Sequence, residues 1–382
     1  MKSARFARRA LATAALALLL APSAAQAQAV LKVNDDVNFR FGFQFQGWAD
    51  WTQSATTGGY AQNLFIRRAR LLVGGSVAKD VTFFFQTDSG NLGKVTNGVK
   101  ATSTGFVIQD AWVSWKLDDA FILDAGLFLV PLSRNILQST LSFYTLDISP
   151  TSTVMAGPTQ TVGLRDTGFQ AKGYLVDGGR LEYRLAAMQG VRDAASQNSF
   201  RTAGYLQYNF FEKERGYVFA GTNLGKKKVL NLNGGFDVQK DYKAYSGDVF
   251  ASIPVAKGDE VGGQVQWIHY DGGTFLKTIP KQDDVLVEAA YYLSKAKVQP
   301  FLKYESQKFA NDVDTAKDQD RFGGGLNWYV SAQNFKITAQ YLRVDPKAGA
   351  QLLFRTTRAG KSTYRSVLFA PPKSKLGSLE DL

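Results

Sequence analysis

The stretch VNFRFGFQFQGWADWT, residues 37–52, alternates apolar and polar side chains along most of its length. The odd positions carry Val37, Phe39, Phe41, Phe43, Phe45, Gly47, Ala49 and Trp51, and the even positions carry Asn38, Arg40, Gly42, Gln44, Gln46, Trp48, Asp50 and Thr52. A period of two places these two sets on opposite faces of one extended strand. The row of phenylalanines ending in tryptophan suits a hydrocarbon surface, and the polar row suits water. One such strand also fits a soluble sandwich.

The alternation recurs along the chain, and its repetition favours a membrane barrel. Five further stretches alternate cleanly: 81–88, 121–127, 181–187, 285–293 and 335–341. Ten weaker candidates are 64–76, 107–117, 166–174, 202–210, 229–239, 244–254, 261–270, 298–306, 322–329 and 362–369. The total is 16, an even number as expected for a single-chain bacterial barrel. We therefore expect an all-β fold, a 16-stranded antiparallel transmembrane β-barrel; a secreted soluble β-protein is the alternative.

The connections between these strands are of two lengths. Short turns are expected at 78–80, 118–120, 176–179, 240–241, 294–296 and 332–333, and long loops at 53–63, 90–105, 130–165, 271–283 and 307–318. Short turns on one side and long loops on the other are typical of outer-membrane barrels. The segment 130–165 is unusually long, contains three prolines and has little strand character. We expect it to fold inward as a constriction loop rather than outward as a surface cap.

The two ends of the chain are interpreted separately from the barrel, which spans residues 28–369. Residues 1–27 combine a basic start, an apolar run and the pattern Ala25-Gln26-Ala27, which is typical of a secretory signal peptide. Residues 370–382 form a polar C-terminal tail. The formal net charge of +12 falls when four basic residues leave with the signal, so nucleic-acid binding is not inferred.

Composition limits the chemistry that the chain can perform. It has no cysteine and one histidine, which excludes thiolate metal sites and CxxC redox chemistry and leaves little room for a Ser-His-Asp triad. We therefore expect no enzyme activity, no catalytic residue, no cofactor and no metal.

Several short motifs together resemble the phosphate-selective porin O/P family. They are Phe65-Ile66-Arg67-Arg68-Ala69-Arg70-Leu71 with Gly74, Phe83-Phe84-Phe85-Gln86-Thr87-Asp88, Gln109-Asp110-Ala111-Trp112-Val113, Gly126-Leu127-Phe128 with Pro131, and Asn334-Phe335-Lys336-Ile337-Thr338-Ala339-Gln340-Tyr341. The resemblance implies a trimeric outer-membrane channel whose third long loop folds inward. It also implies anion passage along rows of lumenal arginine and lysine.

The alternation assigns basic side chains to the lumen. The expected pore-lining anion path consists of Arg40, Arg68, Arg70, Lys116, Arg184, Lys303 and Lys336 on strands, with Arg134 and Arg165 on the loop. Arginine suits this role because its planar fork donates two parallel hydrogen bonds to an oxyanion. The same face also carries seven acids, namely Asp50, Asp88, Asp110, Asp124, Glu182, Glu288 and Glu305, so the bases can equally pair with acids across the pore. Arg67 has the opposite parity and is expected to point outward.

Three functional hypotheses follow. The first is an outer-membrane porin, a passive diffusion channel for small anions such as phosphate or polyphosphate. The second is a general, non-specific diffusion porin, which the balanced lumenal charge favours. The third is an outer-membrane adhesin or enzyme on a barrel platform. For the first we expect a homotrimer in the Gram-negative outer membrane, in contact with lipid and lipopolysaccharide and not with nucleic acid.

Overall fold

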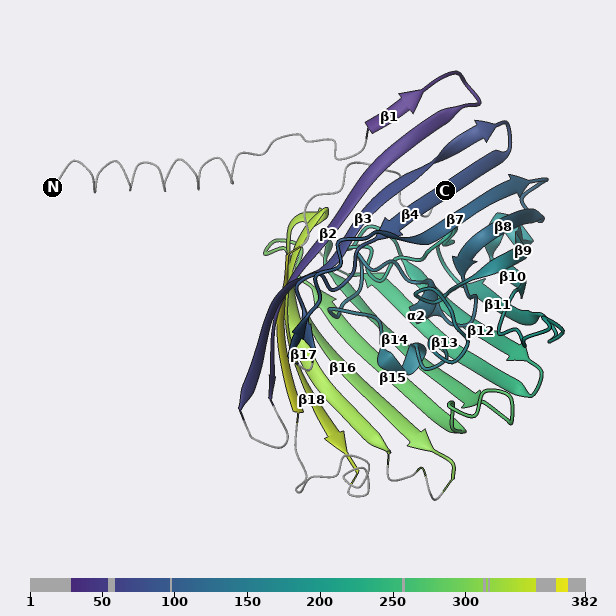
Figure 1. The fold of residues 1–382 in the computed structure, drawn as a ribbon. Helices are drawn as coiled ribbons and strands as arrows, with labels where there is room; N and C mark the ends of the chain where they lie inside the picture. Colours follow the sequence, from purple (N-terminus) through teal and green to yellow (C-terminus); the bar gives the residue numbers. More distant parts are fainter. Residues whose placement is uncertain are drawn as a thin grey trace.

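The computed structural model describes residues 29–53, 59–96, 98–255, 258–311, 314, 317–347 and 362–369. Most of them belong to one strongly curved antiparallel sheet (Figure 1). The expected signal peptide, 1–27, and the expected tail, 370–382, lie outside the described residues. No helix in the described part is long and apolar enough to cross a membrane.

Sixteen strands of this sheet follow one another in chain order, and a short strand is added at the N-terminus. The sixteen are β2 (Asn38–Gln53), β3 (Tyr60–Ala78), β4 (Val81–Asp88), β7 (Val107–Lys116), β8 (Ile122–Leu129), β9 (Arg165–Leu175), β10 (Leu181–Met188), β11 (Arg201–Asn209), β12 (Val229–Gln239), β13 (Tyr242–Pro254), β14 (Glu260–Asp271), β15 (Gln282–Tyr292), β16 (Val298–Phe309), β17 (Gln319–Gln333), β18 (Phe335–Pro346) and β19 (Ser362–Phe369). The short strand β1 (Ala29–Lys32) pairs with β2. The remaining elements are the hairpin β5 (Val95–Thr96) and β6 (Val99–Lys100), the helices α2 (Arg134–Leu137) and α3 (Val176–Gly179), and the 3₁₀ turn η1 (Pro150–Ser152).

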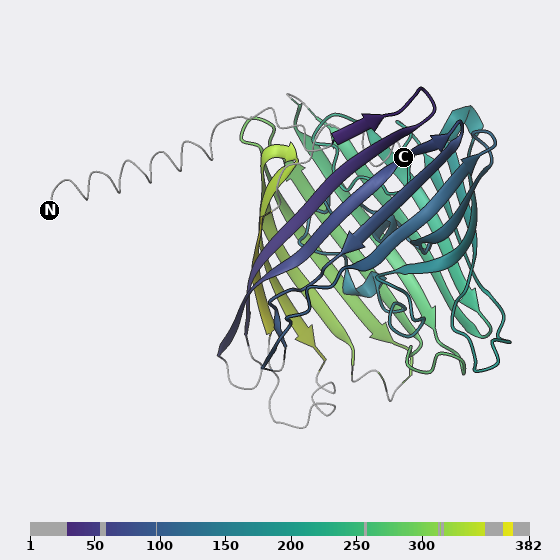
Figure 2. The ribbon, with the colours of Figure 1, turned by 45° about the horizontal axis from the view of Figure 1, so that its top comes forward.

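All sixteen expected strands are present, and each strand from β2 to β18 pairs with the next of the sixteen along the chain. In addition, β19 pairs with β2, from Tyr364 opposite Thr52 to Phe369 opposite Gly47. Figure 2 shows the strands running at a common tilt around the molecule. The expectation of sixteen antiparallel strands is confirmed.

The two faces of the sheet have the polarity opposite to that of a soluble protein. In β2, Phe41 and Phe43 are 43% and 50% exposed, whereas Gln44 and Gln46 are 4% and 1% exposed. The same inversion continues along the other strands, where aromatic and aliphatic side chains face outward and amides, carboxylates and guanidiniums are buried. The alternation of the sequence therefore places the apolar row outside.

The long segment 130–165 packs against the buried polar face of the sheet. Figure 1 shows α2 inside the curve of the strands. The backbone N–H of Arg134 donates to Asp248 on β13, and that of Leu146 donates to Gln340 on β18. A hydrophobic core lies between this segment and the strands, and includes Phe128, Leu132, Leu137, Phe219 and Tyr270.

Two connections depart from the expected arrangement of short turns at one end of the sheet and long loops at the other. Because consecutive strands run antiparallel, connections alternate between the two ends of the sheet. The two-residue turn 240–241 therefore lies at the end that carries the long loops. The 19-residue segment 210–228, between β11 and β12, lies at the opposite end with the short turns. It pairs with segment 130–165 through a bridge between Gln138 and Phe219.

Candidate functional site: a cavity between the arginines of β3 and segment 130–165

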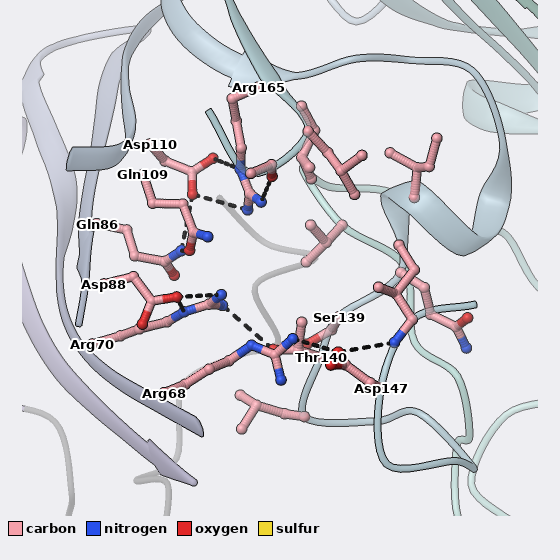
Figure 3. A pocket seen from close by; sticks show the side chains of 18 of the residues that line it. Arg68, Arg70, Gln86, Asp88, Gln109, Asp110, Ser139, Thr140, Asp147 and Arg165 are labelled. Atoms are coloured by element: carbon pink, nitrogen blue, oxygen red, sulfur yellow. Dashed lines mark hydrogen bonds and ion pairs between the residues drawn. The ribbon is translucent and has the colours of Figure 1, made fainter. Parts of the chain in front are cut away.

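A cavity of about 460 Å³ lies between segment 130–165 and the strands β2, β3, β4 and β7 (Figure 3). The strand side contributes mostly polar side chains: Gln44, Arg67, Arg68, Arg70, Gln86, Asp88, Gln109 and Asp110. The segment contributes Asp147 and several apolar side chains, and its last loop residues lead to Arg165 at the start of β9. Four guanidiniums and three carboxylates thus surround the cavity, an excess of one positive charge.

Three of the four arginines come from β3, and a β-bulge determines how they point. The register between β2 and β3 shifts after Gln46, which lies opposite Arg68, so that Arg67 is the extra residue. A bulge places two successive side chains on the same side of a sheet. Arg67 therefore faces the cavity, and the expectation that it points outward is wrong.

Arg67 and Arg68 hold one carboxylate of the loop between them. Arg67 Nη2 lies 2.6 Å from Asp147 Oδ2, and Arg68 Nη2 lies 2.5 Å from Asp147 Oδ1. Burial alone would raise the pKa of Asp147, but the two guanidiniums more than offset it and hold that pKa well below its ordinary value. The loop is therefore clamped to β3 by a carboxylate that stays ionised.

The other two cavity arginines are also paired. Arg70 lies 3.0 Å from Asp88, and its Nη1 donates to Gln44 at 3.4 Å. Arg165 lies 3.1 Å from Asp110. Figure 3 shows these pairs on the strand side of the cavity. All four guanidiniums are thus paired with carboxylates, and the positive charge of each is partly neutralised.

Of the nine predicted anion-path residues, three line this cavity and two have no acidic partner. Arg68, Arg70 and Arg165 are in the cavity. Within the described residues, Arg40 on β2 forms no ion pair. Lys336 on β18 is buried and donates to the carbonyl of Phe143 at 2.7 Å.

The remaining four predicted residues are paired with acids away from the cavity. They are Lys116 with Asp119 at the end of β7, Lys303 with Glu305, Arg184 with Glu182, and Arg134 with Glu214. Five of the seven predicted acids also hold a base: Asp88, Asp110, Asp124, Glu182 and Glu305. The alternative that bases pair with acids therefore describes most of this face.

The contacts of Arg134 are those of a buried structural residue. It is fully buried, it donates two hydrogen bonds to Glu214 at 2.7 and 3.0 Å, and its guanidinium lies 3.7 Å from the ring centroid of Phe250. Burial would lower the pKa of Arg134, but Glu214 raises it above the ordinary value. Arg134 is not among the side chains that line the cavity.

Segment 210–228 reaches the cavity from the other end of the sheet. The Tyr217 hydroxyl donates to Asp110, and it accepts the backbone N–H of Leu129 at 2.9 Å. Burial raises the pKa of Tyr217 well above its ordinary value, so the hydroxyl stays a neutral donor. Asp110 also pairs with Arg165. Segment 210–228, from the end of the sheet with the short turns, therefore helps to position the guanidinium of Arg165, which follows the long segment at the opposite end.

Sequence reasoning missed the cavity's glutamines and Tyr217. Gln86 donates to Gln109 at 2.8 Å and to Asp110 at 2.9 Å, so the amides link the charged pairs. Gln44 and Gln86 share the parity of Arg40 and Asp88, which was a usable signal. Within the described part of the chain, no cluster of acidic and histidine side chains could hold a metal ion.

Comparison with known protein families gives a match for part of the chain. Residues 39–174 match the family described as phosphate-selective porin O and P. No curated protein matches the chain by sequence.

Solved outer-membrane porins share the fold at low sequence identity. An anion-selective porin from Comamonas acidovorans has a TM-score of 0.57 at 12% identity, covering 87% of this chain and 99% of its own. OmpF of Salmonella typhi, solved with daunomycin, has a TM-score of 0.57 at 13% identity, covering 90% and 100%. The outer-membrane channel DcaP of Acinetobacter baumannii has a TM-score of 0.55 at 9% identity, covering 90% and 99%. The resemblance found in the sequence is thus confirmed: residues 39–174 match the model of the phosphate-selective porin O and P family, and the sheet has the fold of outer-membrane porins.

Proposed function

We propose that the protein is an outer-membrane porin, a passive channel through which small anions diffuse past a constriction formed by segment 130–165. The observation that carries this proposal is the inverted polarity of the sheet. Apolar side chains such as Phe43 and Leu206 are half exposed on the outer face, and this arrangement is stable only where hydrocarbon replaces water.

Closure of the sheet into a barrel is part of the proposal. The pairings of β19 with β2 and of β9 with β10 give each of the sixteen strands two neighbours, which supports a wall without edges. A barrel of this size otherwise encloses an aqueous channel. The contacts of segment 130–165 with β3, β13 and β18 support its role as a constriction loop.

Anion preference rests on the charge around the cavity. Four guanidiniums face three carboxylates there, and a field of one sign at a narrow point selects the opposite ion. The Comamonas porin is described as anion-selective, and the family name refers to phosphate. Phosphate or polyphosphate is therefore a candidate solute.

A general diffusion porin is the second candidate function. The pairing of Arg70 with Asp88 and of Arg165 with Asp110 favours it, because each pair weakens the field that an anion would experience. Under both functions we propose export by residues 1–27 to the Gram-negative outer membrane and assembly as a homotrimer in contact with lipid and lipopolysaccharide. Neither function requires a catalysed reaction.

The test is the reversal potential of the purified protein in a planar bilayer with a KCl gradient. We expect reversal on the anion side. Phosphate is then titrated into the chloride current, and block at low concentration would identify a phosphate-type filter. Reversal on the cation side would refute anion preference, and the absence of any channel would refute the porin.

A further inference from the structure

The cavity has two chemically different walls. The strand wall presents guanidiniums, carboxylates and amides, with Arg68 and Arg70 pointing inward (Figure 3). The opposite wall, from segment 130–165, is mainly apolar. It presents Ile136, Leu141, Phe143 and Ile148, and beside them Ser139, Thr140, Thr153 and Asp147. A solute in the cavity therefore meets mainly charged and amide groups on one side and mainly apolar side chains on the other.

Such a cavity suits an inorganic oxyanion poorly. Phosphate carries oxygens in every direction, and those facing the apolar wall would lose water without gaining a hydrogen bond, which is unfavourable. The guanidiniums do not offset this loss fully, because Asp88, Asp110 and Asp147 already occupy part of their donor capacity.

An organic anion satisfies both walls. Its carboxylate is compatible with the single excess positive charge and with the amides of Gln44 and Gln86, and its apolar body covers the side chains of the loop. A volume of about 460 Å³ falls within the range of small-molecule sites.

We propose that this cavity is a subsite for organic carboxylates with a compact apolar body. The carboxylate lies against Arg68 and Arg70, and the body lies against Ile148 and Leu141. The inference rests on the proposed function, because the solute reaches the cavity only if the protein is a channel.

The test compares four probes as blockers of the chloride current through the full-length protein. Benzoate carries both features, acetate lacks the apolar body, benzamide lacks the charge, and inorganic phosphate carries charge alone. We expect the half-blocking concentration of benzoate to be at least tenfold lower than that of acetate or phosphate, a difference of about 1.4 kcal/mol, and no block by benzamide.

Each other outcome is decisive. Equal block by benzoate and acetate would overturn the role of the apolar wall, and equal block by benzamide would overturn the role of the arginines. Stronger block by phosphate would overturn the proposal in favour of an inorganic filter. The reversal potential without any probe tests the proposed function separately, so its failure on the cation side is distinguishable from failure of this inference.

Two matched variants locate the effect on the loop wall. Ile148→Ser replaces an apolar side chain that lines the cavity, and Val154→Ser makes a similar change in a partly buried side chain of the same loop that does not line it. We expect Ile148→Ser to reduce the preference for benzoate over acetate at least threefold and Val154→Ser to leave it unchanged. An unchanged preference in Ile148→Ser, in protein whose conductance shows an intact channel, would overturn the assignment of this wall.

Discussion

Replacing Asp147 by asparagine tests the charge arrangement at the proposed constriction most directly. The carboxylate lies between Arg67 and Arg68, at 2.6 and 2.5 Å, and asparagine keeps the shape while removing the charge. The excess around the cavity then rises from one positive charge to two. We expect stronger anion selectivity with little change in the width of the pore.

The size of the effect follows from Coulomb's law. A unit charge about 5 Å from a passing ion contributes about 0.8 kcal/mol in water. Screening in about 0.1 M salt, where the Debye length is about 10 Å, reduces this to about 0.5 kcal/mol. That energy changes the local anion and cation concentrations by about twofold each and in opposite directions. The anion-to-cation permeability ratio should therefore rise about fivefold.

The assay is the reversal potential in a KCl gradient, measured together with the single-channel conductance. Asp177→Asn is the control, because Asp177 forms an exposed pair with Arg180 in the turn between β9 and β10. That variant loses the same charge and should keep the selectivity of the wild type. A permeability ratio that stays the same or falls in Asp147→Asn would refute the charge assignment.

Acidification should not reproduce this substitution. The two guanidiniums lower the pKa of Asp147, so its charge and the stability of the clamp are fully present above the ordinary value of 3.8 and are lost only as the pH falls through the lowered value. The ratio of the anion selectivity of Asp147→Asn to that of the wild type should therefore be constant between about pH 8 and pH 5. A ratio that falls towards one as the pH is lowered over that interval would show that Asp147 titrates there and that the clamp is weaker than its geometry indicates.

Three further substitutions test the fold. Arg134→Ala leaves Glu214 buried without its partner and should cost about 3–5 kcal/mol, seen as a lower urea midpoint of unfolding; an unchanged midpoint would contradict a structural role. Gly126→Val should prevent assembly of a heat-modifiable folded form, because a Cβ at Gly126 would lie 2.2 Å from the carbonyl oxygen of Ala111. Gly247→Val is the control: a Cβ at Gly247 would have open space, so this variant should fold. Phe43→Lys on the outer face should destabilise the folded protein in lipid by about 2–4 kcal/mol, the cost expected near the middle of the bilayer. Leu64→Lys, near the loop end of β3, should cost much less. Equal free-energy costs for the two variants would contradict a difference in membrane depth between Phe43 and Leu64.

The alternation of the strands could be predicted from sequence because it is a local property of the backbone. Phe41, Phe43, Gln44 and Gln46 lie on the faces that their parity assigns. The same reasoning failed at Arg67, because parity is counted along an uninterrupted strand and the bulge inserts one residue. A sequence pattern cannot show such a shift unless the partner strand and its register are known.

The sequence indicated that bases and acids pair on this face, but it did not identify the partners. Seven predicted bases and seven predicted acids on one face indicated pairing, but which base meets which acid depends on residues far apart in the chain. Arg134 and Glu214 are 80 positions apart, and Glu214 belongs to a segment without any periodic pattern. Arg134 was therefore expected to bind passing anions, and the structure gives it a buried structural partner instead.

Segment 210–228 shows why the cavity could not be derived from the strands alone. Its apolar run Tyr217-Val218-Phe219 was a usable signal of burial, because a solvent-exposed turn has no reason to concentrate such residues. Phe219 pairs with Leu137 through the backbone, and Tyr217 binds Asp110, which in turn holds Arg165. Segments from both ends of the sheet therefore form the cavity. Segment 130–165 supplies its apolar side chains, and segment 210–228 orients the guanidinium of Arg165 through Tyr217 and Asp110. A substitution that loosens Tyr217 would change the charge geometry of the cavity without altering any residue of segment 130–165, so the proposed selectivity depends on both segments together.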